Sequence, residues 1–131
     1  MDSPVRCRGV RGAIAIDNPA DHTQVESAVR KLLSSVLSQN RAFPDDLAAI
    51  IFTLPDDLSA VNPAAAARAA GFDQVPLLAV REHGAVRRVD HCLRVLVLVN
   101  TSIPQAQIRH PYLGEASILR PDLVARDATV R

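Results

Sequence analysis

The clearest secondary-structure signal in the chain lies between residues 21 and 39, where apolar side chains recur at helical spacing. Asp21 is a favourable N-cap, and Gln24 three residues later completes a pattern typical of a capping box. The opposite side of the segment carries polar side chains: Glu26, Arg30 and Ser34. The pattern predicts one long amphipathic helix, which we expect to lie on a sheet with its polar side in water.

Strand signals surround this helix. Apolar or alternating runs predict strands over residues 5–16, 48–54, 75–80 and 91–99, and a last short strand over 116–119. A short helix is predicted to begin after Asn62, its N-cap, with Pro63 at the first position and Gly71 as the left-handed cap. This order predicts an α+β fold, a mixed β-sheet with one long and one short helix on one face.

The predicted strands are too apolar for a sheet that is covered on one side only. In residues 48–54 and 91–99 apolar side chains occupy positions on both faces. Two helices are too few to cover both faces of the sheet. We therefore expect another copy of the chain to cover the second face.

The length of 131 residues suits a single domain, 1–131, in which residues 120–131 are expected to form a flexible tail. The formal net charge is +1 and aromatic residues make up 3%, which argues against a nucleic-acid-binding surface. The sequence has no secretory signal, no apolar run of membrane-spanning length and no metal-ligand spacing. We therefore expect a cytoplasmic protein with reduced thiols that binds neither nucleic acid, membrane nor metal.

Arg94 is the most informative residue, because its neighbours in the segment 93–99 are all apolar. The alternation of a strand places it on the same sheet face as Leu96 and Leu98. An unpaired guanidinium on such a face would lose much of its hydration free energy. Arg94 therefore requires a carboxylate partner, a bound anion or a solvent-filled cleft, and a structural salt bridge meets that requirement as well as a functional site does.

Four further residues are candidates on weaker grounds: Arg11, Glu82, Arg68 and Tyr112. Arg11 lies between two glycines, which let the backbone bend and another group approach. Glu82 follows the third predicted strand, and Arg68 belongs to the short helix. Taken alone, these three are explained better as solvated surface charges. Tyr112 is the only tyrosine, and it suits a position where the ring packs in the core and the hydroxyl contacts water.

Motifs for nucleophilic catalysis, for phosphate-binding glycine loops and for dinucleotide binding are not evident. The chain instead offers several candidate arginines and few candidate carboxylates. This combination is unusual for a hydrolase. It suits a site that binds a dianion and stabilises charge electrostatically.

Several short stretches, in chain order, resemble motifs of the AroH class of chorismate mutases. They are RGVRGA at 8–13, LPDDL at 54–58, PAAAAR at 63–68, VPL at 75–77 with Glu82, CLRV at 92–95, QIRHPYL at 107–113 and LRPDL at 119–123. The similarity runs from about Val5 to Leu123. It implies a homotrimeric pseudo-α/β-barrel with active sites between neighbouring subunits.

The resemblance also implies an activity and a role for each candidate. The activity is that of an isomerase, the cofactor-free Claisen rearrangement of chorismate to prephenate in aromatic amino-acid biosynthesis. By resemblance, Arg94 stabilises negative charge on the breaking ether oxygen, Arg11 and Tyr112 hold the enolpyruvyl carboxylate, and Glu82 accepts a hydrogen bond from the ring hydroxyl. The remaining residues would line the entrance or the walls: Arg68 and Arg120 the entrance, and Ala64, Leu78, Ala79 and Leu119 the walls.

Three positions depart from the family pattern. Asn62 stands in place of an aromatic residue, Ala65 in place of the lysine of some members, and Ala79 in place of a small polar residue. Two alternatives to a chorismate mutase remain, and the departures at Asn62 and Ala79 bear on the second. One is an imine deaminase of the Rid (YjgF-like) type, which also binds a carboxylate with an interface arginine. The other is a degenerate, non-catalytic trimer that binds small anions.

Overall fold

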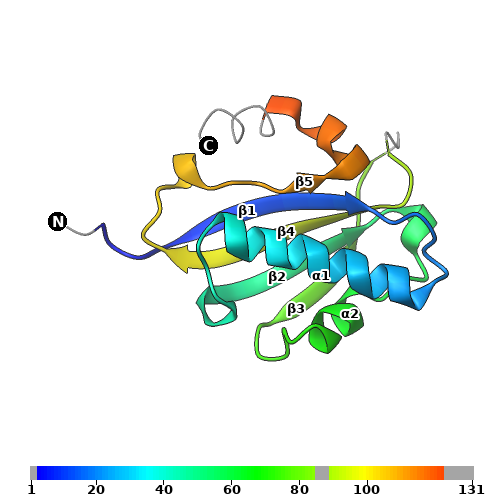
Figure 1. Cartoon of the computed structure of the whole chain (residues 1–131), viewed down its shortest axis with the longest axis horizontal. Helices are drawn as coiled ribbons and strands as arrows, with labels where there is room; N and C mark the ends of the chain where they lie inside the picture. The colour runs from blue at the N-terminus through cyan, green and yellow to red at the C-terminus, as the bar shows by residue number, and fades with distance from the viewer. Residues whose placement is uncertain (1–2, 85–88, 123–131) are drawn as a thin grey trace.

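The computed structural model describes residues 3–84 and 89–122, and Figure 1 shows one sheet with two helices packed on the same face. The principal elements, in chain order, are β1 (Arg6–Ala15), α1 (His22–Gln39), β2 (Leu47–Leu54), α2 (Pro63–Ala69), β3 (Leu77–Arg81), β4 (Cys92–Thr101) and β5 (Tyr112–Leu113). Short 3-10 helices lie at Pro44–Asp46, Asp56–Leu58, Gln105–Gln107 and Gly114–Leu119.

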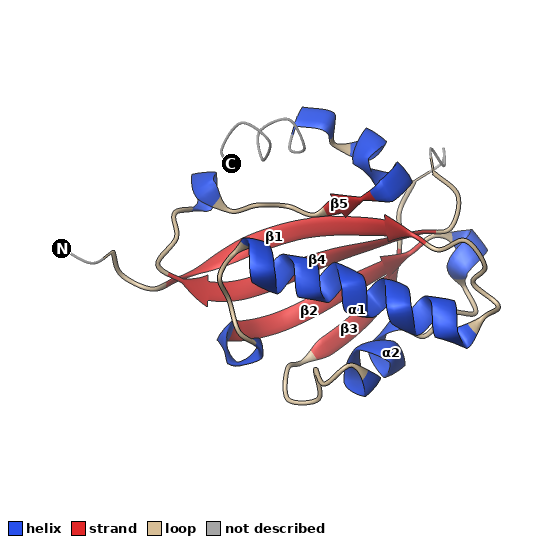
Figure 2. Ribbon diagram, viewed as in Figure 1, coloured by secondary structure: helices blue, strands red, loops and turns tan. Residues whose placement is uncertain are grey.

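The five strands lie in the order β3-β2-β4-β1-β5. The central strand β4 is antiparallel to both of its neighbours, whereas β3 is parallel to β2 and β5 is parallel to β1. Figure 2 shows the helices lying across one face of these strands. The prediction of an α+β fold with a mixed sheet, one long helix and one short helix is confirmed.

The start of α1 follows the sequence signal with one difference. The Asp21 side chain is the N-cap and accepts a hydrogen bond from the Thr23 N–H at 2.9 Å. The Gln24 side chain does not complete a capping box, because its Oε1 accepts from the Asn18 N–H at 2.8 Å. The Asp21 N–H is already bonded to the Asn18 carbonyl at 3.0 Å, so Gln24 ties down the preceding turn instead.

The short helix α2 has the predicted caps. The Asn62 side-chain oxygen accepts from the Ala65 N–H at 3.1 Å, and Pro63 occupies the first turn. Gly71 has a φ of +103°, which a residue with a β-carbon rarely adopts. Asn62 therefore has a structural function that the aromatic residue of the family pattern could not perform, because an aromatic ring offers no acceptor to the helix end.

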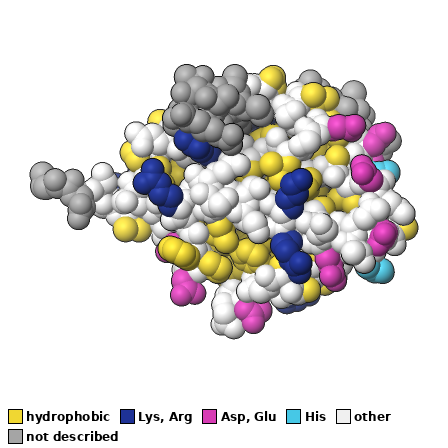
Figure 3. All heavy atoms as spheres, viewed as in Figure 1, with side chains coloured by type: hydrophobic (Ala, Val, Ile, Leu, Met, Phe, Trp, Pro, Cys, Tyr) yellow, Lys and Arg dark blue, Asp and Glu magenta, His cyan; other side chains and the backbone are white. Residues whose placement is uncertain are grey.

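The main core lies between the sheet and the helices. It contains the apolar side of α1 together with alternate residues of the strands, such as Val10, Ile50, Phe52 and Val97. A smaller cluster on the other face joins Ala13, Cys92, Tyr112, Ala116 and Leu119. Figure 3 shows the helix-bearing face, on which basic and acidic side chains are interspersed.

The opposite face of the sheet is largely open. Leu78, Val80 and Leu96 lie on it and keep 56%, 38% and 36% of their surface exposed. The prediction that strands carry apolar side chains on both faces is confirmed, but within one chain nothing described covers this side over β2, β3 and β4.

Of the two predictions about the C-terminal part, one is wrong and the other concerns residues that lie mostly outside the described part. The strand predicted over 116–119 is wrong, because Gly114–Leu119 forms a 3-10 helix and the last strand is Tyr112–Leu113. Gly114 has a φ of +57° and turns the chain out of the sheet directly after two paired residues. Most of the predicted tail, residues 123–131, lies outside the described part, as do residues 85–88. Among the helices of the described residues, none has the length and apolarity to cross a membrane.

Gly12 sits where β1 passes close to both α1 and the segment before β5. A β-carbon at Gly12 would lie 3.0 Å from the Pro111 carbonyl oxygen and 3.1 Å from Leu32 Cδ1, whereas one at Gly9 would lie 3.6 Å from Leu96 Cδ1. We expect Gly12→Ala to lower the free energy of unfolding by about 1–3 kcal/mol, as overpacking does. Gly9→Ala is the matched control and should change it by less than about 1 kcal/mol. Urea denaturation of both variants measures the difference; equal losses would contradict the close approach.

Candidate active site

Arg94 lies on the open face of the central strand. Along β4, Val95, Val97 and Val99 are buried, while Arg94, Leu96 and Leu98 are half-buried or exposed. The sequence prediction that Arg94 shares a face with Leu96 and Leu98 is therefore confirmed. Arg94 is flanked by Ala13 of β1 on one side and by Thr53 of β2 on the other.

The charge of Arg94 is matched by Glu82. Arg94 Nε lies 2.9 Å from Glu82 Oε1, and the same oxygen accepts a hydrogen bond from Thr53 Oγ1 at 3.0 Å. The Nε–H does not align with the carboxylate well enough to count as a hydrogen bond, so the contact is an ion pair. The two side chains are 41% and 24% exposed, so the pair contributes at most about 1 kcal/mol to stability. Arg94 is thus held by a carboxylate without being sealed in a dry interior.

Tyr112 and Arg11 lie on the same side of Arg94. Ala13 pairs with Arg94 across β1–β4 and with Tyr112 across β1–β5, so these residues form one row across three strands. Arg11 is two residues earlier on the same face of β1 and is exposed. Burial raises the pKa of the Tyr112 hydroxyl, and the positive charges of Arg11, Arg120 and Arg94 oppose that rise. Tyr112 is therefore a neutral hydrogen-bond donor at physiological pH.

Leu119 and Arg120 lie above this row. Leu119 packs in the small cluster with Tyr112. Arg120 forms a two-pronged contact with Asp122, with Nε–Oδ1 at 3.1 Å and Nη2–Oδ2 at 3.0 Å, and the hydrogen bond to Asp122 raises the pKa of Arg120. The structure therefore brings six predicted residues to one end of the open face: Arg94, Glu82, Arg11, Tyr112, Leu119 and Arg120.

The other five predicted residues lie at the opposite edge of the sheet. Asn62, Ala64 and Arg68 belong to the α2 region, which packs on α1 and β3. Leu78 and Ala79 are exposed residues of β3, the edge strand. Ala79 pairs with Phe52, a core residue, so it faces the helix side of the sheet while Leu78 faces the open side. One chain therefore does not bring these five residues to the Arg94 group.

Two residues of the site were missed by the sequence analysis. Thr53 supports Glu82, and its signal was a lone hydroxyl in the apolar run 48–54. His110 is buried and its Nδ1 accepts a hydrogen bond from the Arg11 N–H at 2.9 Å. This bond fixes the backbone of Arg11 from outside the strand ladder. The sequence gives no signal for it, because the bond depends on how the segment around His110 lies beside β1.

The outer edge of β1 is completed mostly by side chains. Gln105 accepts from the Gly9 N–H at 3.0 Å and donates to the Gly9 carbonyl at 2.7 Å. His110 Nδ1 accepts from the Arg11 N–H, and the Pro111 carbonyl accepts from the Ala13 N–H at 3.0 Å. The segment 105–111 thus takes the place of a neighbouring strand beside the site and fixes the backbone of β1 at Arg11.

The composition of the site limits its chemistry. Within residues 3–84 and 89–122, His, Cys, Asp and Glu side chains form no group of three that could hold a metal ion. The nearest thiol, Cys92, is buried, and desolvation raises its pKa to about 11 despite the positive charge of Arg94. Cys92 therefore stays a protonated thiol and is a poor nucleophile. The arrangement can bind an anion and stabilise negative charge.

The two cysteines should differ strongly in reactivity. Cys7 is exposed, whereas Cys92 is buried with a raised pKa. At pH 8 we expect an aromatic disulfide reagent to label one thiol per chain quickly, and the second only after unfolding. Cys7→Ser should remove the fast phase, and Cys92→Ser should retain it. Fast labelling of the Cys7→Ser variant would show that Cys92 is accessible and ionised.

Comparison with known proteins agrees with this geometry. Residues 7–123 match the family model described as chorismate mutase type I. The chain is 44% identical over 117 residues to chorismate mutase AroH of Thermus thermophilus, covering 88% of this chain and 95% of the relative. It is 34% identical over 117 residues to chorismate mutase AroH of Bacillus subtilis (strain 168), covering 88% of this chain and 91% of the relative.

A solved chorismate mutase structure from Clostridium thermocellum is also similar. The TM-score is 0.78 at 32% sequence identity, over 84% of this chain and 97% of that chain. The family model, over residues 7–123, spans nearly all of the sheet, both helices and the segment that carries Tyr112. On these grounds the chain belongs to the chorismate mutase type I family.

Proposed function

We propose that this chain catalyses the rearrangement of chorismate to prephenate at the Arg94–Glu82 site. The chain is a chorismate mutase by family, and hence an isomerase of aromatic amino-acid biosynthesis. The observation that supports the location is the Arg94 side chain, which is held by Glu82 yet remains 41% exposed on an otherwise apolar sheet face. The family match favours this activity over an imine deaminase.

The reaction is intramolecular: one carbon–oxygen bond breaks while one carbon–carbon bond forms, and no proton is transferred. Catalysis therefore has two parts. The substrate must be held in a compact conformer, which is a task of positioning. Negative charge that grows on the ether oxygen must be met by a fixed positive group, which stabilises the transition state more than the substrate.

Arg94 is suited to the second task because its position is set before substrate arrives. The ion pair with Glu82, and the hydrogen bond from Thr53 to Glu82, hold one side of the guanidinium. The exposed part keeps N–H donors available for an oxygen of the substrate. A cation that is already oriented needs no reorganisation as the bond breaks.

Arg11 and Tyr112 are suited to the first task. They lie on the same face as Arg94, and their charge and neutral hydroxyl together match a carboxylate. Glu82 Oε1 faces Arg94 and Thr53, and we assign its carboxylate a hydrogen bond from the substrate hydroxyl. Leu119 supplies an apolar wall and Arg120 a charge at the entrance.

The remaining residues complete the site from a second subunit in this proposal. Asn62, Ala64, Arg68, Leu78 and Ala79 lie at the β3 edge, away from Tyr112 and Arg11 at the β1–β5 edge. A cyclic homotrimer would bring the β3 edge of one chain to the β5 edge of the next and cover the exposed Leu78, Val80 and Leu96. Each active site would then contain residues of two chains.

Replacing Arg94 tests the catalytic role. We expect Arg94→Ala to lower kcat by at least about 10²–10³-fold, the loss typical of removing one preorganised donor to a developing oxyanion. Arg30→Ala, an exposed arginine of α1, is the control and should leave kcat unchanged. Loss of chorismate absorbance measures both. Turnover of Arg94→Ala at the control rate would exclude the assigned role.

Mixing two inactive variants tests whether the site is shared. If Arg94 and Arg68 act in one site but belong to different chains, Arg94→Ala and Arg68→Ala co-expressed in equal amounts should form hybrid trimers. By random assembly, about one quarter of their sites would keep both arginines. Turnover should therefore recover to about one quarter of the unsubstituted value. Recovery to no more than the mean of the two single variants would contradict a shared site.

A further inference from the structure

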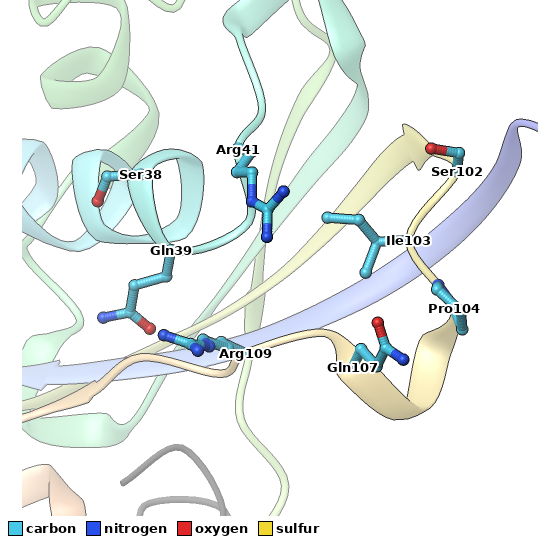
Figure 4. A pocket seen from close by; sticks show the side chains of 8 residues that line it. All are labelled: Ser38, Gln39, Arg41, Ser102, Ile103, Pro104, Gln107 and Arg109. Atoms are coloured by element: carbon cyan, nitrogen blue, oxygen red, sulfur yellow. The ribbon is translucent and has the colours of Figure 1, made fainter. Parts of the chain in front are cut away.

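A cavity of about 570 Å³ opens at the end of the molecule away from Arg94. It lies between the C-terminal end of α1 and the segment that follows β4 (Figure 4). Its lining includes Gln39 and Arg41 on one side and Ser102, Ile103, Gln107 and Arg109 on the other. The volume is within the range of small-molecule sites in proteins.

Two guanidinium groups line this cavity without a carboxylate. No hydrogen bond or ion pair of either the Arg41 or the Arg109 side chain is found among residues 3–84 and 89–122. In Figure 4 the Arg41 side chain extends from the α1–β2 connection toward the Ile103 loop, and Arg109 lies beside Gln39. The Gln39 Oε1 is buried and has no hydrogen-bond partner, so it does not accept a hydrogen bond from Arg109.

The backbone fixes both arginines in place. The buried Asn40 side chain donates to the Val36 carbonyl at 2.9 Å and to the Arg109 carbonyl at 3.0 Å, and accepts from the Arg109 N–H at 2.8 Å. Arg41 follows directly and has a φ of +50°, with the next residue bonded back to α1. The relative position of the two backbone segments that carry these arginines is therefore set by the fold before any ligand binds.

The end of α1 does not cancel this positive charge. A helix C-terminus carries roughly half a negative charge, against two full positive charges here. Two carbonyls near this end are already occupied: the Leu37 carbonyl accepts from the N–H groups of Asn40 and Ala42, and the Val36 carbonyl accepts from the Asn40 side chain. The cavity lining contains no aspartate or glutamate. The local field therefore favours an anion.

We propose that this cavity binds a small organic dianion, through carboxylate or phosphate oxygens that both guanidinium groups grip. Planar guanidinium forks match the paired oxygens of either group. The site is separate from the catalytic one, because Ser102 follows Arg94 by eight residues along an extended strand, a span of roughly 25 Å. It does not depend on the proposed catalytic roles.

Calorimetric titration with malonate and with inorganic phosphate at low ionic strength tests this site. The protein carries Arg11→Ala and Arg94→Ala, which removes the two arginines assigned to the oxygens of the substrate. We expect saturable binding in the millimolar range or tighter. The tighter of the two probes identifies carboxylate or phosphate as the preferred group.

Substitutions in the same background locate the ligand. Arg41→Asn, which tolerates the positive φ, and Arg109→Gln should each weaken binding by at least about tenfold. Arg41→Gly is a second variant for that position, and Arg30→Gln is the control that should leave affinity unchanged. Unchanged affinity in both cavity variants, or no saturable binding in the folded parent, would overturn the proposal. Thermal unfolding of every variant verifies that it is folded.

Discussion

The contact between Arg94 and Glu82 is the interaction on which the site depends. A guanidinium on the central strand of a sheet is tolerated only if its charge is matched and part of it stays hydrated. Here β3 ends where Glu82 comes level with Arg94, and the Thr53 hydroxyl holds the carboxylate in place. The same arrangement leaves the remainder of the guanidinium on the open face. The ion pair that allows Arg94 to lie on the central strand therefore also orients its charge.

The two faces of the sheet therefore differ in character. The helix-covered face is filled by large side chains of α1 and alternate strand residues, and needs nothing further. The other face combines the charged row near β1 and β5 with exposed apolar side chains near β3. Exposed apolar side chains that lie together are typical of a surface that a partner covers. The trimer proposed above would cover the apolar part and leave the charged part accessible to substrate.

Much of this fold could be predicted from the sequence, and the wrong or missing predictions have physical causes. The periodicity of α1, the caps at Asn62 and Gly71 and the alternation around Arg94 are local signals, and all of them are confirmed. The prediction of a strand over 116–119 is wrong because a four-residue segment with three apolar side chains fits a 3-10 turn as well as a strand, and Gly114 favours the turn. Thr53 and His110 escaped notice because their partners, Glu82 and Arg11, are 29 and 99 residues away.

The side chains that complete the edge of β1 have a consequence for the solubility of the chain. An exposed strand edge offers unpaired N–H and C=O groups to any other extended peptide, and so promotes aggregation. Gln105 occupies both groups at Gly9, and His110 occupies the N–H of Arg11, through hydrogen bonds that a foreign strand would have to displace. These bonds oppose intermolecular strand addition at this edge, and the free edge of β3 is where such pairing would begin if the subunits came apart.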